Sequence, residues 1–183
     1  MKIELLGDEV GKIVTQAVKE SFAMQGHKLT GELERSIEYK VNQQRDAINI
    51  DFYLYDYGMI QNYGVTASRI PFNPGSGAKT SKYIDGLKNF AKLRFGVDDK
   101  KAKSIAFAIA YKHKQQGMPT RGSYAYSKNG KRTGAIFDAL RESDDKVMEL
   151  INAAYSEYIT QNILNVITEV QKKDSENIKF FIR

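Results

Sequence analysis

The chain has 183 residues, of which 42% are hydrophobic, so it is long enough to bury one core and we expect one domain over residues 1–183. It contains no cysteine, which excludes disulfide bonds and thiolate metal sites and makes a reducing cytoplasm the simplest place of synthesis. We expect no export signal, because Lys2 and Glu4 interrupt the N-terminal apolar patch, and no membrane partner, because no window approaches the roughly 18 apolar residues of a spanning helix.

The net charge of +6 is unevenly distributed along the chain. Residues 66–134 contain 15 Lys or Arg against three acids, whereas the remainder contains 13 against 19. Within the basic segment, residues 100–134 carry nine basic side chains and no acid, a pattern that favours phosphates or an acidic protein surface. A solvated face plus a loop is an equally good interpretation.

A helix and a hairpin are the first predicted elements. Asp8 is expected to cap a helix whose apolar residues repeat at helical spacing as far as Phe22, and Gly26 is expected to end it. The period then changes to two over residues 37–41 and 48–54, which predicts two strands. The short polar turn at residues 42–46 indicates an antiparallel hairpin with one buried face, covered by the helices.

The segment 56–81 is rich in Gly, Pro, Asn and Ser, which predicts a long surface loop. Aromatic residues within such a loop indicate contact with a partner. The candidate contact residues here are Tyr57, Tyr63, Arg69 and Phe72.

Two helices are predicted next, the first ending at Gly96 and the second capped by Asp98 or Asp99 and ending at Gly117. Residues 118–133 then predict an exposed irregular excursion, or a small hairpin turning at residues 129–130. This excursion supplies a second set of candidate contacts, to a DNA channel or to another subunit: Arg121, Tyr124, Tyr126, Lys128, Lys131 and Arg132. Basic and aromatic side chains suit nucleic acid, but Tyr and Arg also dominate protein interfaces, which we favour here.

The last third keeps one apolar face from Ile136 to Val170, longer than a typical globular helix. It is expected either to break near Thr160 or to run on and pack against a neighbouring copy. Residues 178–182 alternate in a way that could add a closing strand to the hairpin. The fold class expected is therefore α+β, a small antiparallel sheet packed against several helices, with a helical extension over about residues 141–183.

Sequence motifs for catalysis are weak. The string GSGAKT at residues 75–80 fails as a phosphate-binding loop, because alanine precedes the lysine and no buried strand leads in. The two histidines, His27 and His113, lie in different predicted elements without partners at metal-ligand spacing, and His113 is expected to face solvent or phosphate. Asp144 and Asp145 are neighbours on a polar helix face and do not face each other. We therefore expect no metal, no cofactor and no enzymatic activity.

Three strings resemble the neck proteins of tailed bacteriophages, which join head to tail and complete the tail. The string TGELERSI at residues 30–37 is similar to the family's Thr-Gly-x-Leu-x-x-Ser-Ile pattern before the first strand. Residues 57–64, which end in NYG, are similar to the place after the second strand where the family commonly has Glu-aromatic-Gly, with Asn62 in place of the acid. Residues 86–120, with GLKNFA, AKSIAFAIA and GMPT, resemble the family's helix pair and the segment that follows it. The long C-terminal helical region is an extension that the family does not supply.

The resemblance implies a structural protein of the virion neck, synthesised in the host cytoplasm. It implies a homo-oligomeric ring of six or twelve copies, with genomic DNA passing through its centre. Its expected neighbours are portal or adaptor proteins and tail or other neck proteins. A basic nucleic-acid-binding protein is the alternative, and a hydrolase with an unrecognised site is a third interpretation.

Overall fold

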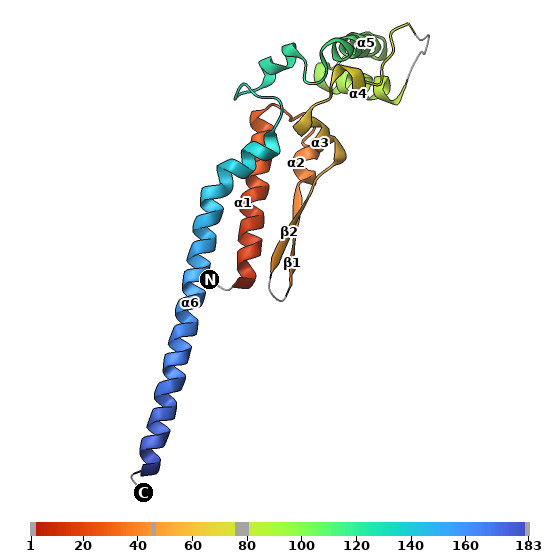
Figure 1. The fold of residues 1–183 in the computed structure, drawn as a ribbon. Helices are drawn as coiled ribbons and strands as arrows, with labels where there is room; N and C mark the ends of the chain where they lie inside the picture. The colour runs from red at the N-terminus through yellow and green to blue at the C-terminus, as the bar shows by residue number, and fades with distance from the viewer. Residues whose placement is uncertain (1–2, 45–46, 76–80, 182–183) are drawn as a thin grey trace.

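A computed structural model describes residues 3–44, 47–75 and 81–181. In chain order the elements are α1 (Ile3–Met24), α2 (Glu32–Ser36), β1 (Glu38–Gln43), β2 (Ile48–Tyr53), α3 (Asp56–Tyr63), η1 (Ala67–Arg69), α4 (Lys82–Phe95), α5 (Asp99–Gln116), η2 (Arg121–Tyr126) and α6 (Ala135–Phe181). The α1 helix packs against both the hairpin and the first part of α6, α4 and α5 pair at one end, and the rest of α6 extends away from the body (Figure 1). This is the expected α+β fold.

The main core lies between α1 and the start of α6. Val14, Val18 and Phe22 share one face of α1 because they are spaced at three to four residues, and all three are buried. Ala135 and Ala139 of α6 are fully buried against that face. Because alanine side chains are small, the two helices can approach each other closely along this contact.

The hairpin packs onto α1 at two glycines. β1 and β2 pair antiparallel, with Val41 opposite Ile50. A Cβ atom at Gly11 would lie 2.3 Å from the ring of Tyr39, and one at Gly7 would lie 2.7 Å from Val41. Because real side chains cannot approach so closely, the absence of a side chain at Gly7 and Gly11 lets the hairpin pack closely against α1 at these two positions.

Asp8 does not cap α1, contrary to the expectation, because the helix begins five residues earlier, at Ile3. Its carboxylate accepts a hydrogen bond of 2.5 Å from the Tyr39 hydroxyl and pairs with Lys12 at 2.7 Å. The side-chain hydrogen bonds from Lys12 and Tyr39 lower the pKa of Asp8. A residue predicted to cap the start of the helix instead ties the helix to the sheet.

We predict that Gly11→Ala lowers the free energy of unfolding by about 1–2 kcal/mol, because overpacking against Tyr39 outweighs the gain in helix propensity. Thermal or urea unfolding of the purified chain measures this. Gly86→Ala in α4 is the matched control, since no atom lies within 4 Å of the added Cβ, and it should raise stability by up to about 1 kcal/mol. Equal effects of the two substitutions would show that the close approach at Gly11 is absent.

The predicted helix pair is confirmed as α4 and α5. Ser81 accepts a hydrogen bond from the Ile84 N–H to cap α4, and Asp98 accepts one from the Lys101 N–H to cap α5. Ile84, Ala106 and Ala110 form the buried centre of a second, smaller core between the two helices. Asp99 in the first turn of α5 pairs with Lys88 and Lys92 of α4. These ion pairs join the start of α5 to the middle and the last turn of α4.

Three expectations about secondary structure were wrong. The segment 56–81 is not one long loop, since it forms α3 and the short η1, and its residues 76–80 lie outside the described part of the chain. Residues 118–133 form η2 and turns, so the alternative of a small hairpin at residues 129–130 is wrong and the irregular excursion is what the structure has. The closing strand is absent as far as Phe181, because α6 continues through it without a break at Thr160, and Ile182 is not described. Within the described residues, no helix combines the length and hydropathy needed to cross a membrane.

Candidate interaction surfaces

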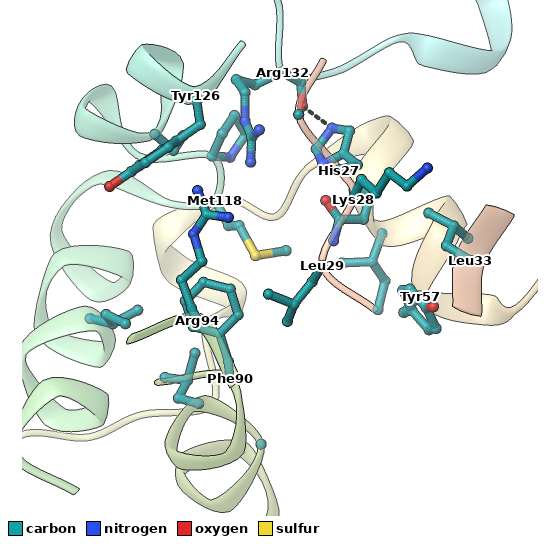
Figure 2. A pocket seen from close by; sticks show the side chains of 18 of the residues that line it. His27, Lys28, Leu29, Leu33, Tyr57, Phe90, Arg94, Met118, Tyr126 and Arg132 are labelled. Carbon is teal, nitrogen blue, oxygen red and sulfur yellow. Dashed lines mark hydrogen bonds between the residues drawn. The ribbon is translucent and has the colours of Figure 1, made fainter. Parts of the chain in front are cut away.

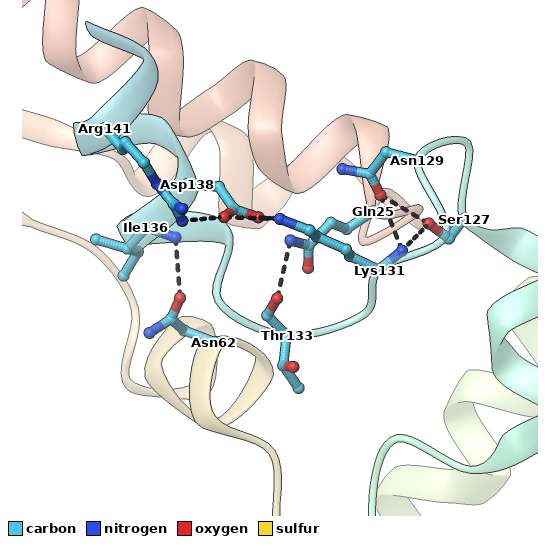
Figure 3. A network of polar contacts seen from close by, with 9 residues as sticks. All are labelled: Gln25, Asn62, Ser127, Asn129, Lys131, Thr133, Ile136, Asp138 and Arg141. Carbon is cyan, nitrogen blue, oxygen red and sulfur yellow. Dashed lines mark hydrogen bonds and ion pairs between the residues drawn. The ribbon is translucent and has the colours of Figure 1, made fainter. Parts of the chain in front are cut away.

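A polar junction fixes the start of α6 against the ends of α1 and α3 (Figure 3). Asn62 of α3 is only 2% exposed, and its side-chain oxygen accepts a hydrogen bond of 2.9 Å from the Ile136 N–H. Its backbone carbonyl accepts another, of 2.7 Å, from the Gly134 N–H. The Gln25 amide donates to the Thr133 carbonyl at 3.0 Å. Asn62 therefore caps a helix that begins more than seventy residues later in the sequence.

Lys131 belongs to this junction. The carboxylate of Asp138, which is 7% exposed, accepts hydrogen bonds from the Lys131 ammonium to both oxygens at 2.9 Å and one from Arg141 at 2.9 Å (Figure 3). Asp138 lies in the first turn of α6, where the helix dipole favours a negative charge. Because its charge is already paired, Lys131 is poorly placed to serve as a free DNA contact.

Arg132 is also held by the body of the protein. Its guanidinium donates to the Gln25 carbonyl at 2.5 Å, and its own carbonyl accepts a hydrogen bond of 3.2 Å from the His27 ring. Burial lowers the pKa of Arg132, and the nearby positive charge of Arg94 lowers it further. Lys131 is ion-paired but still exposed, whereas Arg132 is partly buried, so the expectation of an exposed excursion is wrong at Arg132.

We predict that Asp138→Ala lowers the free energy of unfolding by about 1–2 kcal/mol, because it removes charge-assisted hydrogen bonds at a buried site. Asp144→Ala, at an exposed position two turns along the same helix, is the matched control and should change stability by less than about 0.5 kcal/mol. Chemical denaturation of both variants provides the comparison. If the two substitutions lower the free energy of unfolding equally, the ion pairs of Asp138 do not stabilise the start of α6.

A groove of about 690 Å³ lies between the loop after α1, α3, α4 and the segment around η2 (Figure 2). Leu29, Phe90 and Met118 are among the apolar side chains that line it. Tyr57 lines it from the first predicted contact segment, and Tyr126 lines it from the second. The two segments that the sequence proposed separately as contacts thus meet at one hollow surface.

The rim of the groove is basic. The Arg94 guanidinium lies 5.0 Å from the centre of the Tyr126 ring, a cation–π contact, and Arg132 lies nearby (Figure 2). Lys28, also at the groove, pairs with Glu34 at 2.8 Å. This combination of apolar lining and guanidinium groups suits a protein segment that carries apolar and acidic side chains.

The other predicted contact residues have different surroundings. Phe72 is half-buried, with its ring centre 5.0 Å from that of Tyr111, so it serves the core of the helix pair. Tyr63 is exposed and meets Phe137 edge to face at 5.8 Å. The remaining four are exposed and available for contacts: Arg69, Arg121, Tyr124 and Lys128.

A second surface lies on α6 beyond the end of α1. Residues 155–173 of α6 are all exposed, although many of them are large and apolar. Burying one such side chain contributes about 1.5–3 kcal/mol, so this surface is costly to leave in water. The sequence showed the apolar face but did not show that the chain leaves it uncovered. The groove-lining Leu29 and Leu93 were not singled out by the sequence, and Phe90 was marked only as an apolar position of the predicted helix pair.

The histidines are partly buried, and His113 does not face solvent or phosphate as expected. Its ring shares a hydrogen bond of 2.7 Å with the Tyr83 hydroxyl, and burial lowers the pKa of His113. Burial and the charge of Arg132 lower the pKa of His27 from 6.5 to about 4. Among the described residues, no group of three or more His, Asp or Glu side chains is placed to hold a metal ion.

We predict that stability falls as the pH drops from about 6.5 to 4, because over this range the unfolded chain binds a proton at His27 that the folded chain does not. Allowing for partial exposure, the loss is about 1–2 kcal/mol. Thermal unfolding between pH 4 and 8 measures it. His27→Gln should flatten this part of the profile, and an unchanged slope would assign the acid sensitivity to other groups.

No known protein family, curated protein or solved structure matches the chain.

Proposed function

We propose that this chain is a structural protein of a tailed-phage virion, which forms a ring in the neck between the portal or its adaptor and the tail. The single observation that carries the proposal is the uncovered apolar surface of α6, from Tyr155 onward. A surface of this kind in a water-soluble body calls for a partner chain. The resemblance of residues 30–37, 57–64 and 86–120 to neck proteins supports the choice of assembly.

The groove gives the proposed ring a second kind of surface. A closed ring needs two different patches on each subunit, one for each neighbour. The groove is lined by residues of α3, α4 and the segment around η2, whereas the α6 surface lies on the part of α6 that extends away from the body (Figure 1). Contacts within the ring and contacts to adjacent neck proteins can therefore use separate parts of the subunit.

The contacts of the polar junction change which residues we propose to face the DNA. Lys131 and Arg132 bind within the subunit, whereas Arg121 and Lys128 are exposed, as are Lys100, Lys101, Lys103 and Lys112 on α5. We place the DNA channel beside this exposed basic surface. The same surface supports the alternative function, a nucleic-acid-binding protein, because unpaired lysines attract phosphates without reading sequence.

Quantitative mass spectrometry of purified virions tests the proposal. In a phage that encodes this chain, we expect a fixed number of copies per particle, six or twelve. Absence of the chain from intact virions would reject the neck function. A strongly salt-dependent mobility shift of DNA by the purified chain, together with that absence, would favour the alternative.

Charge reversal at exposed positions tests the channel. Arg121→Glu with Lys128→Glu should lower the yield of infectious particles at least tenfold, because the introduced carboxylates repel the phosphates of the passing DNA. The melting temperature of the chain should stay unchanged. Lys146→Glu, on an exposed face of α6, is the control. Deleting residues 121–132 is a poorer test, since it also removes the contacts of Lys131 and Arg132. Wild-type yields from the double variant would place the channel elsewhere.

A further inference from the structure

The free part of α6 begins where α1 no longer covers it. Ala154, which is fully buried, is the last buried residue of α6 among those whose side chains the structure describes. Beyond it lie eight large apolar side chains that are each between 47% and 60% exposed; besides Leu164 and Ile167, they are Tyr155, Tyr158, Ile159, Ile163, Val166 and Val170. We call the last six of these residues, from Tyr155 to Val170 as named, the α6 stripe.

The α6 stripe continues a straight line that starts in the body. Phe137, Met148, Ile159 and Val170 recur at intervals of 11 residues, and all four are exposed. Eleven residues make almost three whole turns, so side chains at this spacing stay on one side of a straight helix. From Met148 to Val170 the line is about 33 Å long, at 1.5 Å per residue.

The length of this line of apolar side chains decides which kind of partner can cover it. The groove, at about 690 Å³, accommodates only a few side chains and cannot cover a straight surface of about 33 Å. Another straight helix of similar length can. Among the described residues, α6 itself is the element with an uncovered apolar face of that length, so a second copy of this chain matches it.

The charge pattern also fits a second copy. Residues 150–168 contain a single charged residue, Glu157, which lies on the side of the helix away from Ile159 and Val166. Two identical stripes therefore meet without repulsion between like charges. A nucleic acid or a strongly charged partner would find almost nothing there to pair with.

The width of the stripe points to more than two helices. At 100° per residue, the apolar positions from Tyr158 round to Ile167 cover about half of the helix circumference, wider than the seam of a two-stranded coiled coil. The two flanks differ, with Tyr158 and Asn162 on one and Ile163 and Ile167 on the other. Two unlike flanks suit a helix that contacts two neighbours in a closed ring.

We propose that the α6 stripes of several copies pack side by side and in parallel, each helix touching two neighbours, so that α6 is the element that closes the ring. This inference rests on the proposed function for its cyclic symmetry. The contact it names, α6 against α6, is independent of whether the ring is part of a virion.

Sedimentation velocity and native mass spectrometry of the full chain test the contact. We expect assemblies larger than a dimer for the wild type. Ile159→Glu with Ile163→Glu should weaken association at least tenfold and yield folded monomers with unchanged helix content by circular dichroism. Gln161→Glu with Thr168→Glu, which adds the same charge to the opposite face, is the matched control and should assemble as the wild type does. A monomeric wild type, or a stripe variant that assembles normally, would overturn the inference.

Cross-linking tests the parallel arrangement. Because the chain has no cysteine, Asn162→Cys with Ile163→Cys places one thiol on each flank at nearly the same height. A short bismaleimide should then join successive copies into a ladder beyond the dimer, whereas either single cysteine should stop at the dimer or below. A double variant that stops at the dimer would indicate an antiparallel pair and contradict the proposal.

The results separate this inference from the neck function. If the stripe variants break the assembly but the chain is absent from virions, the α6 contact stands and the neck function fails. If the chain is a fixed component of virions and the stripe variants still form the ring, the neck function stands and the α6 contact fails.

Discussion

The cap that Asn62 places on α6 is the contact on which the arrangement of the molecule depends. A helix start leaves backbone N–H groups without partners, and here one of them is satisfied by a buried side chain from α3. Because Gln25 at the end of α1 binds the same connection through Thr133, three distant parts of the chain are fixed at one point. The direction of α6, and so the position of its apolar surface, follows from this point.

The same junction shapes the groove. Gly64, two residues after the capping Asn62, has a φ of 72°, and a Cβ atom added to it would lie 2.6 Å from the Met118 carbonyl oxygen. This close approach lets Val65 and Met118 exchange two backbone hydrogen bonds of 2.7 Å. The bridge joins the segment after α3 to the segment after α5, so the groove is built from parts of the chain that the same contact network holds together.

The α6 extension has the opposite character, since it is ordered as a helix without support from its own chain. A long helix can hold its shape through its backbone hydrogen bonds, but its apolar side chains gain nothing until they are buried. Nineteen consecutive residues of α6, 155–173, are exposed, whereas the earlier part of α6 packs against α1. This division is what a subunit of a larger assembly requires, and it underlies both proposals above.

The sequence by itself determined the elements whose signals are local. Helical spacing and a cap at Asp98 or Asp99 predicted the α4–α5 pair, and alternation predicted the hairpin. The apolar face from Ile136 to Val170 predicted a long helix but left a break near Thr160 open, and alternation at residues 178–182 predicted a strand where α6 continues to Phe181. Tertiary structure decided the rest, because it depends on contacts between residues far apart in the chain. Asn62 lies in a stretch whose composition indicates a loop, and its role depends on the N–H of Ile136, 74 residues away in the first turn of α6. Lys131 and Arg132 look like free basic side chains until Asp138 and Gln25 are seen beside them. Local spacing records which side of an element is apolar, but only the folded chain shows which polar groups are already paired and which apolar face is left uncovered.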